Sequence, residues 1–71
     1  MNSRQFLASI HVLGRKRGLA VRLDKKRGKG SHSLLYFGNH RTVLPNHKGD
    51  IGVGLLKSMC RDLGITRDAL K

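Results

Sequence analysis

Two β-prone segments separated by only two residues constrain the fold more than any other feature of the sequence. The segments are residues 32–37 and 40–44, and Gly38 and Asn39 stand between them. A two-residue connection in which glycine takes a positive φ is typical of a tight hairpin turn. Pro45 then ends the second segment, because it cannot donate a hydrogen bond to a neighbouring strand. The two segments are therefore predicted to pair as an antiparallel hairpin.

A third predicted strand precedes the hairpin. Apolar residues alternate with other residues from Leu19 to Asp24, and a period of two with one apolar face indicates a strand. The first hairpin strand is apolar on both faces, with Leu34 and Tyr36 on one and Leu35 and Phe37 on the other. The pattern leaves open which of these two faces meets the helices.

A first amphipathic helix is predicted over residues 3–13. Ser3 is expected to cap its N-terminus, and Gly14 is expected to end it. Its apolar face is formed by side chains three and four positions apart, namely Phe6, Leu7, Ile10 and Leu13.

A second helix is predicted over residues 53–63. Gly64 is expected just after its last turn, with Ile65 folding back onto the helix end. Thr66 would then cap a last short turn that runs through Ala69. Polar side chains occupy one face of this helix, and the other face is apolar, with Leu55, Leu56, Met59, Cys60 and Leu63.

The predicted order of elements is α-β-β-β-α, within one domain that spans residues 1–71. Two helices packed on one face of a three-stranded antiparallel sheet make an α+β fold. A chain of this length hides only about 60% of its unfolded surface, so its core is thin. The other face of the sheet would turn apolar and aromatic side chains toward solvent or a partner, and such a patch suggests a protein interface.

The chain is strongly cationic. It has 15 Lys and Arg residues, four Asp and no Glu, which gives a formal charge of +11. Eight of these cations lie between Arg15 and Lys29, and a basic cluster of that density is typical of proteins that bind nucleic acid. A solvated face is the plainer alternative for these charges. A membrane surface is disfavoured as the partner, because the cluster lacks a large apolar face.

Cysteine content and hydropathy exclude several other classes. Cys60 is the single cysteine, so no intramolecular disulfide is expected, and the ligand spacings of a metal site are missing. No metal and no small-molecule cofactor is therefore expected. No apolar run approaches the roughly 20 residues of a membrane span, and no signal peptide is evident. We expect a cytoplasmic protein, since a free thiol suits a reducing compartment.

The loop between the first two predicted strands combines cations, glycines and a histidine. Its cations would attract a polyanion; they are Lys25, Lys26, Arg27 and Lys29. Gly30 lacks a Cβ, so the backbone there can approach a ligand closely. His32 follows, and an imidazole can move a proton near neutral pH. From the residues alone, His32 is interpreted as a surface histidine at the start of a strand.

Three stretches of the chain match the pattern of one family. They are residues 1–6 leading to Gly14, then Gly30-Ser31-His32, and then residues 45–52 followed by 54–56 and 63–65. With these stretches in this order, nearly the whole chain resembles the HicA family of mRNA-interferase toxins from bacterial toxin–antitoxin pairs. The resemblance implies a fold like that of double-stranded-RNA-binding domains, RNA cleavage that arrests translation, and a HicB-type antitoxin that masks the site.

The same resemblance implies roles for particular residues. The family's catalytic histidine falls on His32, with Gly30 and Ser31 beside it, and the loop over residues 24–29 is longer and more basic than in many members. An RNase without metal can use the 2′-OH of RNA as nucleophile, and His32 would then be the general base. Lys29 and the backbone N–H groups of Gly30 and Ser31 would hold the scissile phosphate.

Other polar and aromatic residues have two interpretations each. Lys48 would hold the RNA backbone near a helix N-terminus, and His47 would either assist it or order the loop. Tyr36 and Phe37 could stack on bases, although core or antitoxin contacts are favoured. The chain as a whole has two alternatives to the ribonuclease, which are a non-catalytic RNA-binding module and a protein whose main work is pairing with another protein.

Overall fold

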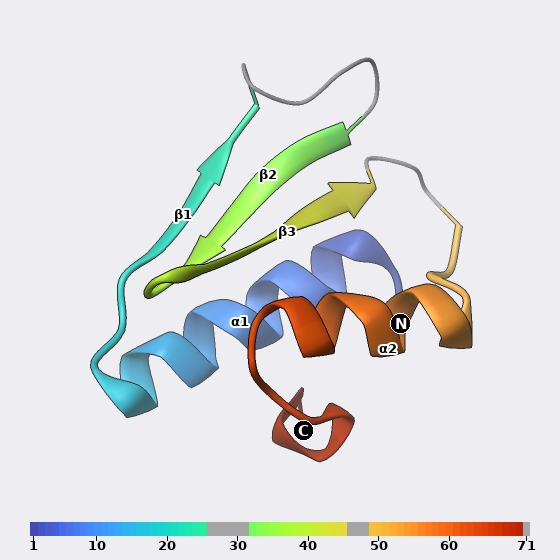
Figure 1. Ribbon diagram of the computed structural model, residues 1–71. Helices are drawn as coiled ribbons and strands as arrows, with labels where there is room; N and C mark the ends of the chain where they lie inside the picture. Colours follow the sequence, from blue (N-terminus) through green and yellow to red (C-terminus); the bar gives the residue numbers. More distant parts are fainter. Residues whose placement is uncertain (26–31, 46–48, 71) are drawn as a thin grey trace.

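The computed structural model of the protein describes residues 1–25, 32–45 and 49–70. In these parts the chain forms helix α1 (Ser3–Arg17), strands β1 (Val21–Asp24), β2 (His32–Phe37) and β3 (His40–Pro45), helix α2 (Val53–Asp62) and the short 3₁₀ helix η1 (Arg67–Leu70). Both long helices lie on one side of the sheet (Figure 1). The predicted α-β-β-β-α arrangement is therefore confirmed.

The three strands form an antiparallel sheet in the order β1-β2-β3. The hairpin between β2 and β3 is confirmed, since Phe37 pairs with His40 and Gly38 takes a φ of +60°. The first strand is shorter than predicted, because it begins at Val21. Strand β2 ends just before Gly38. Ala20 lies opposite the hairpin turn, and its carbonyl oxygen accepts a hydrogen bond from the Gly38 N–H at 2.9 Å.

The first helix begins differently from the prediction. Asn2, and not Ser3, is the N-cap: its side chain accepts a hydrogen bond from the Gln5 N–H at 2.8 Å, and the Gln5 side chain accepts one from the Asn2 N–H at 2.9 Å. This reciprocal pair is a capping box. Ser3 lies in the first turn and is buried, and its hydroxyl donates to the carbonyl oxygen of Pro45. The serine therefore joins the start of α1 to the end of β3.

The prediction that Gly14 ends the first helix is wrong. The helix continues to Arg17 and ends at Gly18, which takes a φ of +68°. Gly14 is buried inside the helix, where a Cβ would lie 2.5 Å from Cγ2 of Val21 and 3.0 Å from the carbonyl oxygen of Leu19. The glycine therefore serves close packing of α1 against the chain that enters β1.

The end of the second helix agrees with the prediction. Gly64 takes a φ of +71° just after the C-cap residue Leu63. Its N–H donates to the Arg61 carbonyl oxygen at 3.1 Å, and the Ile65 N–H donates to the Cys60 carbonyl oxygen at 2.9 Å. These two bonds are those of a Schellman motif. Ile65 is buried, so the chain does fold back onto the helix end.

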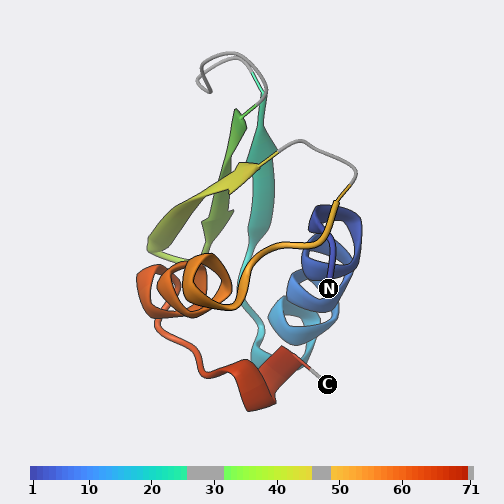
Figure 2. The same ribbon diagram turned by 90° about the vertical axis from the view of Figure 1, so that its right-hand side faces the viewer.

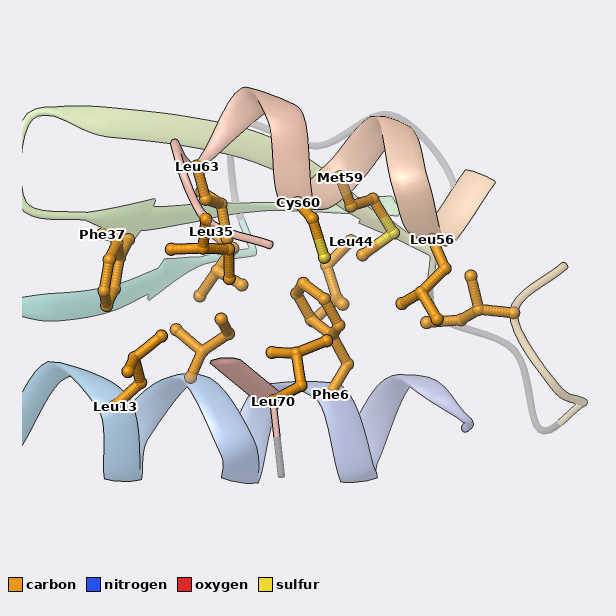
Figure 3. Packing of buried hydrophobic residues seen from close by; sticks show 13 residues of the cluster. Phe6, Leu13, Leu35, Phe37, Leu44, Leu56, Met59, Cys60, Leu63 and Leu70 are labelled. Carbon is orange, nitrogen blue, oxygen red and sulfur yellow. The ribbon is translucent and has the colours of Figure 1, made fainter. Parts of the chain in front are cut away.

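A single buried layer lies between the sheet and the two helices (Figure 2 and Figure 3). Leu35 and Phe37 face this layer, which settles the orientation of β2 that the sequence left open. Thr42 adds a polar link, since its hydroxyl donates to Oδ2 of Asp62 at 2.9 Å and so joins β3 to α2. The largest fully buried side chains of the core are Phe6, Phe37, Ile10, Leu35, Met59 and Leu63.

Cys60 belongs to this core. It is only 2% exposed, and burial raises the pKa of its thiol above the usual range, while the nearby Arg67 guanidinium acts in the opposite direction. A buried thiol resists ionisation because its thiolate would lose hydration. Cys60 is therefore a small apolar core residue, as the sequence indicated.

The packing of Gly14 generates a prediction about stability. Gly14→Ala should lower the free energy of unfolding by about 1–3 kcal/mol, because the added methyl group overpacks the contact with β1. Gly54→Ala is the matched control, since a Cβ there meets no atom within 4 Å, and it should raise stability by up to about 1 kcal/mol through helix propensity. Urea unfolding of both variants measures this. Equal effects of the two substitutions would contradict the packing role of Gly14.

The raised pKa of Cys60 generates a prediction about pH. The unfolded thiol ionises at lower pH than the folded one, so the folded state loses stability as pH rises past the unfolded pKa. The difference in free energy of unfolding between wild type and Cys60→Ala should therefore narrow from about pH 7 to about pH 10. Urea unfolding of wild type and Cys60→Ala at each pH gives this difference. The other titrating groups contribute equally to both proteins, so their contributions cancel. A constant difference would show that the thiol ionises alike in both states.

Candidate functional site

His32 is the first residue of β2 and is exposed. It pairs with Pro45 across the hairpin, so it lies at the end of the sheet where β1 and β3 both finish (Figure 1). Side chains alternate along a strand, and the next residue, Ser33, is buried against the helices. His32 therefore lies on the opposite face of β2, together with Leu34 and Tyr36.

Contacts from the start of the chain support this end of the sheet. Ser3 bonds to the carbonyl oxygen of Pro45, the partner of His32. The Met1 carbonyl oxygen accepts a hydrogen bond from the Ile51 N–H at 2.8 Å, and the terminal ammonium of Met1 lies 3.6 Å from Oδ1 of Asp50. The first three residues of the chain therefore contact both the last residue of β3 and the segment that leads to α2.

A small hollow lies beside this end of the sheet. Its volume is about 220 Å³, and it is lined by Ser3, Arg4, Leu7, Leu23, Lys25, Ser33, Leu44 and Pro45. Arg4 and Lys25 are exposed cations from α1 and from the end of β1. Their position beside the strand that carries His32 suits the attraction of a polyanion. No local pattern in the sequence points to Arg4, because only the folded chain brings the first turn of α1 to this hollow.

The structure places two of the predicted site residues, His32 and Lys25, at the same end of the sheet. The other predicted residues lie outside the described part of the chain, namely Lys26, Arg27, Lys29, Gly30, Ser31, His47 and Lys48.

The remaining described histidines are remote from His32. His11 is exposed on α1. His40 is exposed at the opposite end of the hairpin, where a Cβ on Gly64 would lie 3.2 Å from its ring. Within residues 1–25, 32–45 and 49–70, no group of three His, Cys, Asp or Glu side chains is placed to hold a metal ion.

The two candidate stacking residues separate onto different faces. Phe37 is 1% exposed in the core, which removes it as a platform for bases. Tyr36 is half-buried on the face that points away from the helices, and the Arg22 guanidinium carbon lies 4.5 Å from its ring centroid. Tyr36 is therefore the one of the two that a ligand can reach.

Comparison with known proteins identifies the family. A family model described as the HicA toxin of bacterial toxin–antitoxin matches residues 21–65, which run from β1 to the turn after α2. No curated protein and no solved structure matches the chain significantly. In the described residues, no helix is long and apolar enough to cross a membrane. The match covers more than half of the chain and includes the strand that carries His32, so this protein belongs to the HicA toxin family.

Proposed function

We propose that this HicA-family toxin is a metal-independent endoribonuclease that cleaves mRNA and so arrests translation. The observation that carries the proposal is an exposed imidazole at the start of β2 in a chain of this toxin family. In this role His32 is the general base, since an imidazole can accept a proton near neutral pH. The high positive charge of the chain supports an anionic substrate.

The proposed reaction uses the 2′-OH of the RNA as nucleophile. His32 removes its proton, and the 2′ oxygen attacks the adjacent phosphorus. The bond from phosphorus to the 5′ oxygen of the next nucleotide then breaks, and this oxygen takes up a proton from water, which leaves a 2′,3′-cyclic phosphate on one product and a 5′-OH on the other. A positioned base of this kind contributes about a hundred- to ten-thousandfold to the rate.

Groups around the end of the sheet would bind the RNA. Lys29 and the N–H groups of Gly30 and Ser31 are proposed to stabilise the charge that develops on the scissile phosphate. Longer-range attraction would come from two sources. The first source is the loop between β1 and β2, with Lys25, Lys26 and Arg27. The second is Lys48, which would attract the RNA backbone near α2, with His47 as an auxiliary group. Arg4 joins this set because it lines the same hollow as Lys25.

The partner protein is proposed to be a HicB-type antitoxin. A toxin of a toxin–antitoxin family implies an antitoxin partner, and an inhibitor that covers the sheet end with His32 would block RNA access. The cationic stretch over residues 15–29 begins at the C-terminal end of α1 and includes Lys25, which lines the hollow beside that sheet end. The antitoxin surface that meets it is therefore expected to be acidic, because complementary charge speeds encounter.

The role of His32 is tested by cleavage of a messenger RNA in EDTA. His32→Ala should lower the cleavage rate by about a hundred- to ten-thousandfold, because it removes the base that activates the 2′-OH. The side chain is exposed, so thermal unfolding should be unchanged. His11→Ala and His40→Ala are matched controls, since both residues are exposed and remote from His32, and both should cleave like wild type.

Other results of this experiment would contradict the proposal. Equal cleavage by wild type and His32→Ala would place the activity elsewhere. RNA binding without cleavage by either protein would favour the non-catalytic RNA-binding module. Loss of wild-type activity in EDTA, restored by a divalent cation, would contradict a metal-independent reaction.

The charge of the antitoxin surface generates a second prediction. The association rate of toxin and antitoxin should fall as salt is raised, and reversal of a cation of the basic stretch at the sheet end with His32, as in Lys25→Glu, should slow association further. Stopped-flow mixing at two ionic strengths measures this. Arg67→Glu, which lies in η1 outside the basic stretch, is the control and should have a smaller effect. Rates that do not depend on salt would argue against an acidic partner surface.

A further inference from the structure

A row of three side chains crosses the face of the sheet that points away from the helices. Arg22 pairs with Tyr36 across β1 and β2, and Tyr36 pairs with Arg41 across β2 and β3. Directly paired residues in an antiparallel sheet point to the same face. The Arg22–Tyr36–Arg41 row is therefore an aromatic ring between two cations, one on each neighbouring strand.

The geometry of this row is already partly organised. The guanidinium carbon of Arg22 lies 4.5 Å from the centroid of the Tyr36 ring, within the range of a cation–π contact. Arg22 and Arg41 are exposed, and Tyr36 is half-buried. In the described part of the chain, both long helices lie on the other side of the sheet (Figure 2). The Arg22 guanidinium thus lies over the ring and is exposed, so a ligand can reach it from solvent.

The row also lies on the same face as the proposed catalytic base. His32 and Tyr36 are four residues apart on β2, and residues separated by an even number point to the same side of a strand. At a rise of roughly 3.3 Å per residue, the two positions are about 13 Å apart along the strand. Leu34 and its partner Val43, which is 48% exposed, lie between them. A chain laid along β2 would reach both His32 and the row.

The chemistry of the row favours single-stranded nucleic acid over a protein. Unpaired bases stack on aromatic rings and on the planes of arginine guanidinium groups. Arginine also binds phosphate oxygens through its planar set of donors. A ring between two arginines provides both kinds of contact, and its place on the same sheet face as His32 connects it to an RNA substrate.

We propose that the Arg22–Tyr36–Arg41 row is a stacking platform for one base of the single-stranded RNA substrate. The base stacks on the plane of the exposed Arg22 guanidinium, which Tyr36 holds in place, and Arg41 contacts the neighbouring phosphate. The platform positions the RNA along β2 relative to His32. This inference rests on the proposed function for the identity of the substrate, but it concerns binding and not the chemical step.

Binding of a short RNA with methylated 2′ oxygens tests the platform, because methylation blocks the nucleophile and the RNA stays intact. Tyr36→Leu keeps an apolar side chain on the sheet and removes the ring, and Arg22→Lys keeps the charge and removes the plane. Both should weaken binding about ten- to a hundredfold. Tyr36→Phe should restore affinity to within about twofold of wild type, since it keeps the ring. Arg61→Lys, an exposed arginine on α2, is the matched control and should bind like wild type.

A set of RNAs with one abasic position each identifies the stacked base. At one position, removal of the base should weaken binding to wild type but not to Tyr36→Leu, because the variant has already lost the contact. Equal sensitivity of wild type and Tyr36→Leu at every position would overturn the platform. Thermal unfolding of each variant shows whether the sheet is intact.

The outcomes separate this inference from the proposed function. If wild type cleaves unmodified RNA and the substitutions in the row leave binding unchanged, the platform is wrong and the ribonuclease stands. If the row governs binding but wild type never cleaves RNA, the platform stands and the ribonuclease is wrong. If the variants bind RNA normally but lose the antitoxin, the face is a protein interface and the platform is overturned.

Discussion

The alternation of side chains along β2 is the constraint on which the rest of the structure depends. Leu35 and Phe37 point into the single buried layer, and the same alternation turns His32 and Tyr36 to the opposite face. A slip of one residue would expose Phe37 and bury His32. The Gly38 turn prevents such a slip, because it fixes the pairing of β2 with β3. One register thus determines both the core and the position of the proposed base.

Contacts at both ends of the hairpin hold this register in place. At the end with His32, Ser3 bonds to the carbonyl oxygen of Pro45. Nearer the turn, Thr42 donates to Asp62 and joins the edge strand β3 to α2. A chain with a thin core and no disulfide depends on such links, since each helix buries only one face against the sheet. The proposed site therefore lies on strands whose other face packs against both helices.

Much of the fold could be predicted from local sequence signals, and the errors have a common cause. The hairpin and the end of α2 follow from glycines at positive φ, which local pattern reveals. Gly14 is also a glycine, but its role is tertiary packing, because Val21 of β1 occupies the space that a side chain at position 14 would need. The strand start at His32 was likewise predictable. Two placements could not be predicted, because they depend on tertiary packing that local sequence patterns do not encode. Arg4 lies beside Lys25, and Tyr36 lies on the open face of the sheet rather than in the core.

The central claim is that the RNA supplies its own nucleophile, the 2′-OH, to a base at the start of β2. The most direct measurement replaces the ribose at the cleaved position of an RNA with a single 2′-deoxyribose and follows cleavage by the wild-type protein in EDTA. The account predicts that this position is no longer cut, while binding of the RNA is retained. Continued cleavage at the deoxy position would mean that water is the nucleophile, and would contradict the mechanism proposed for His32.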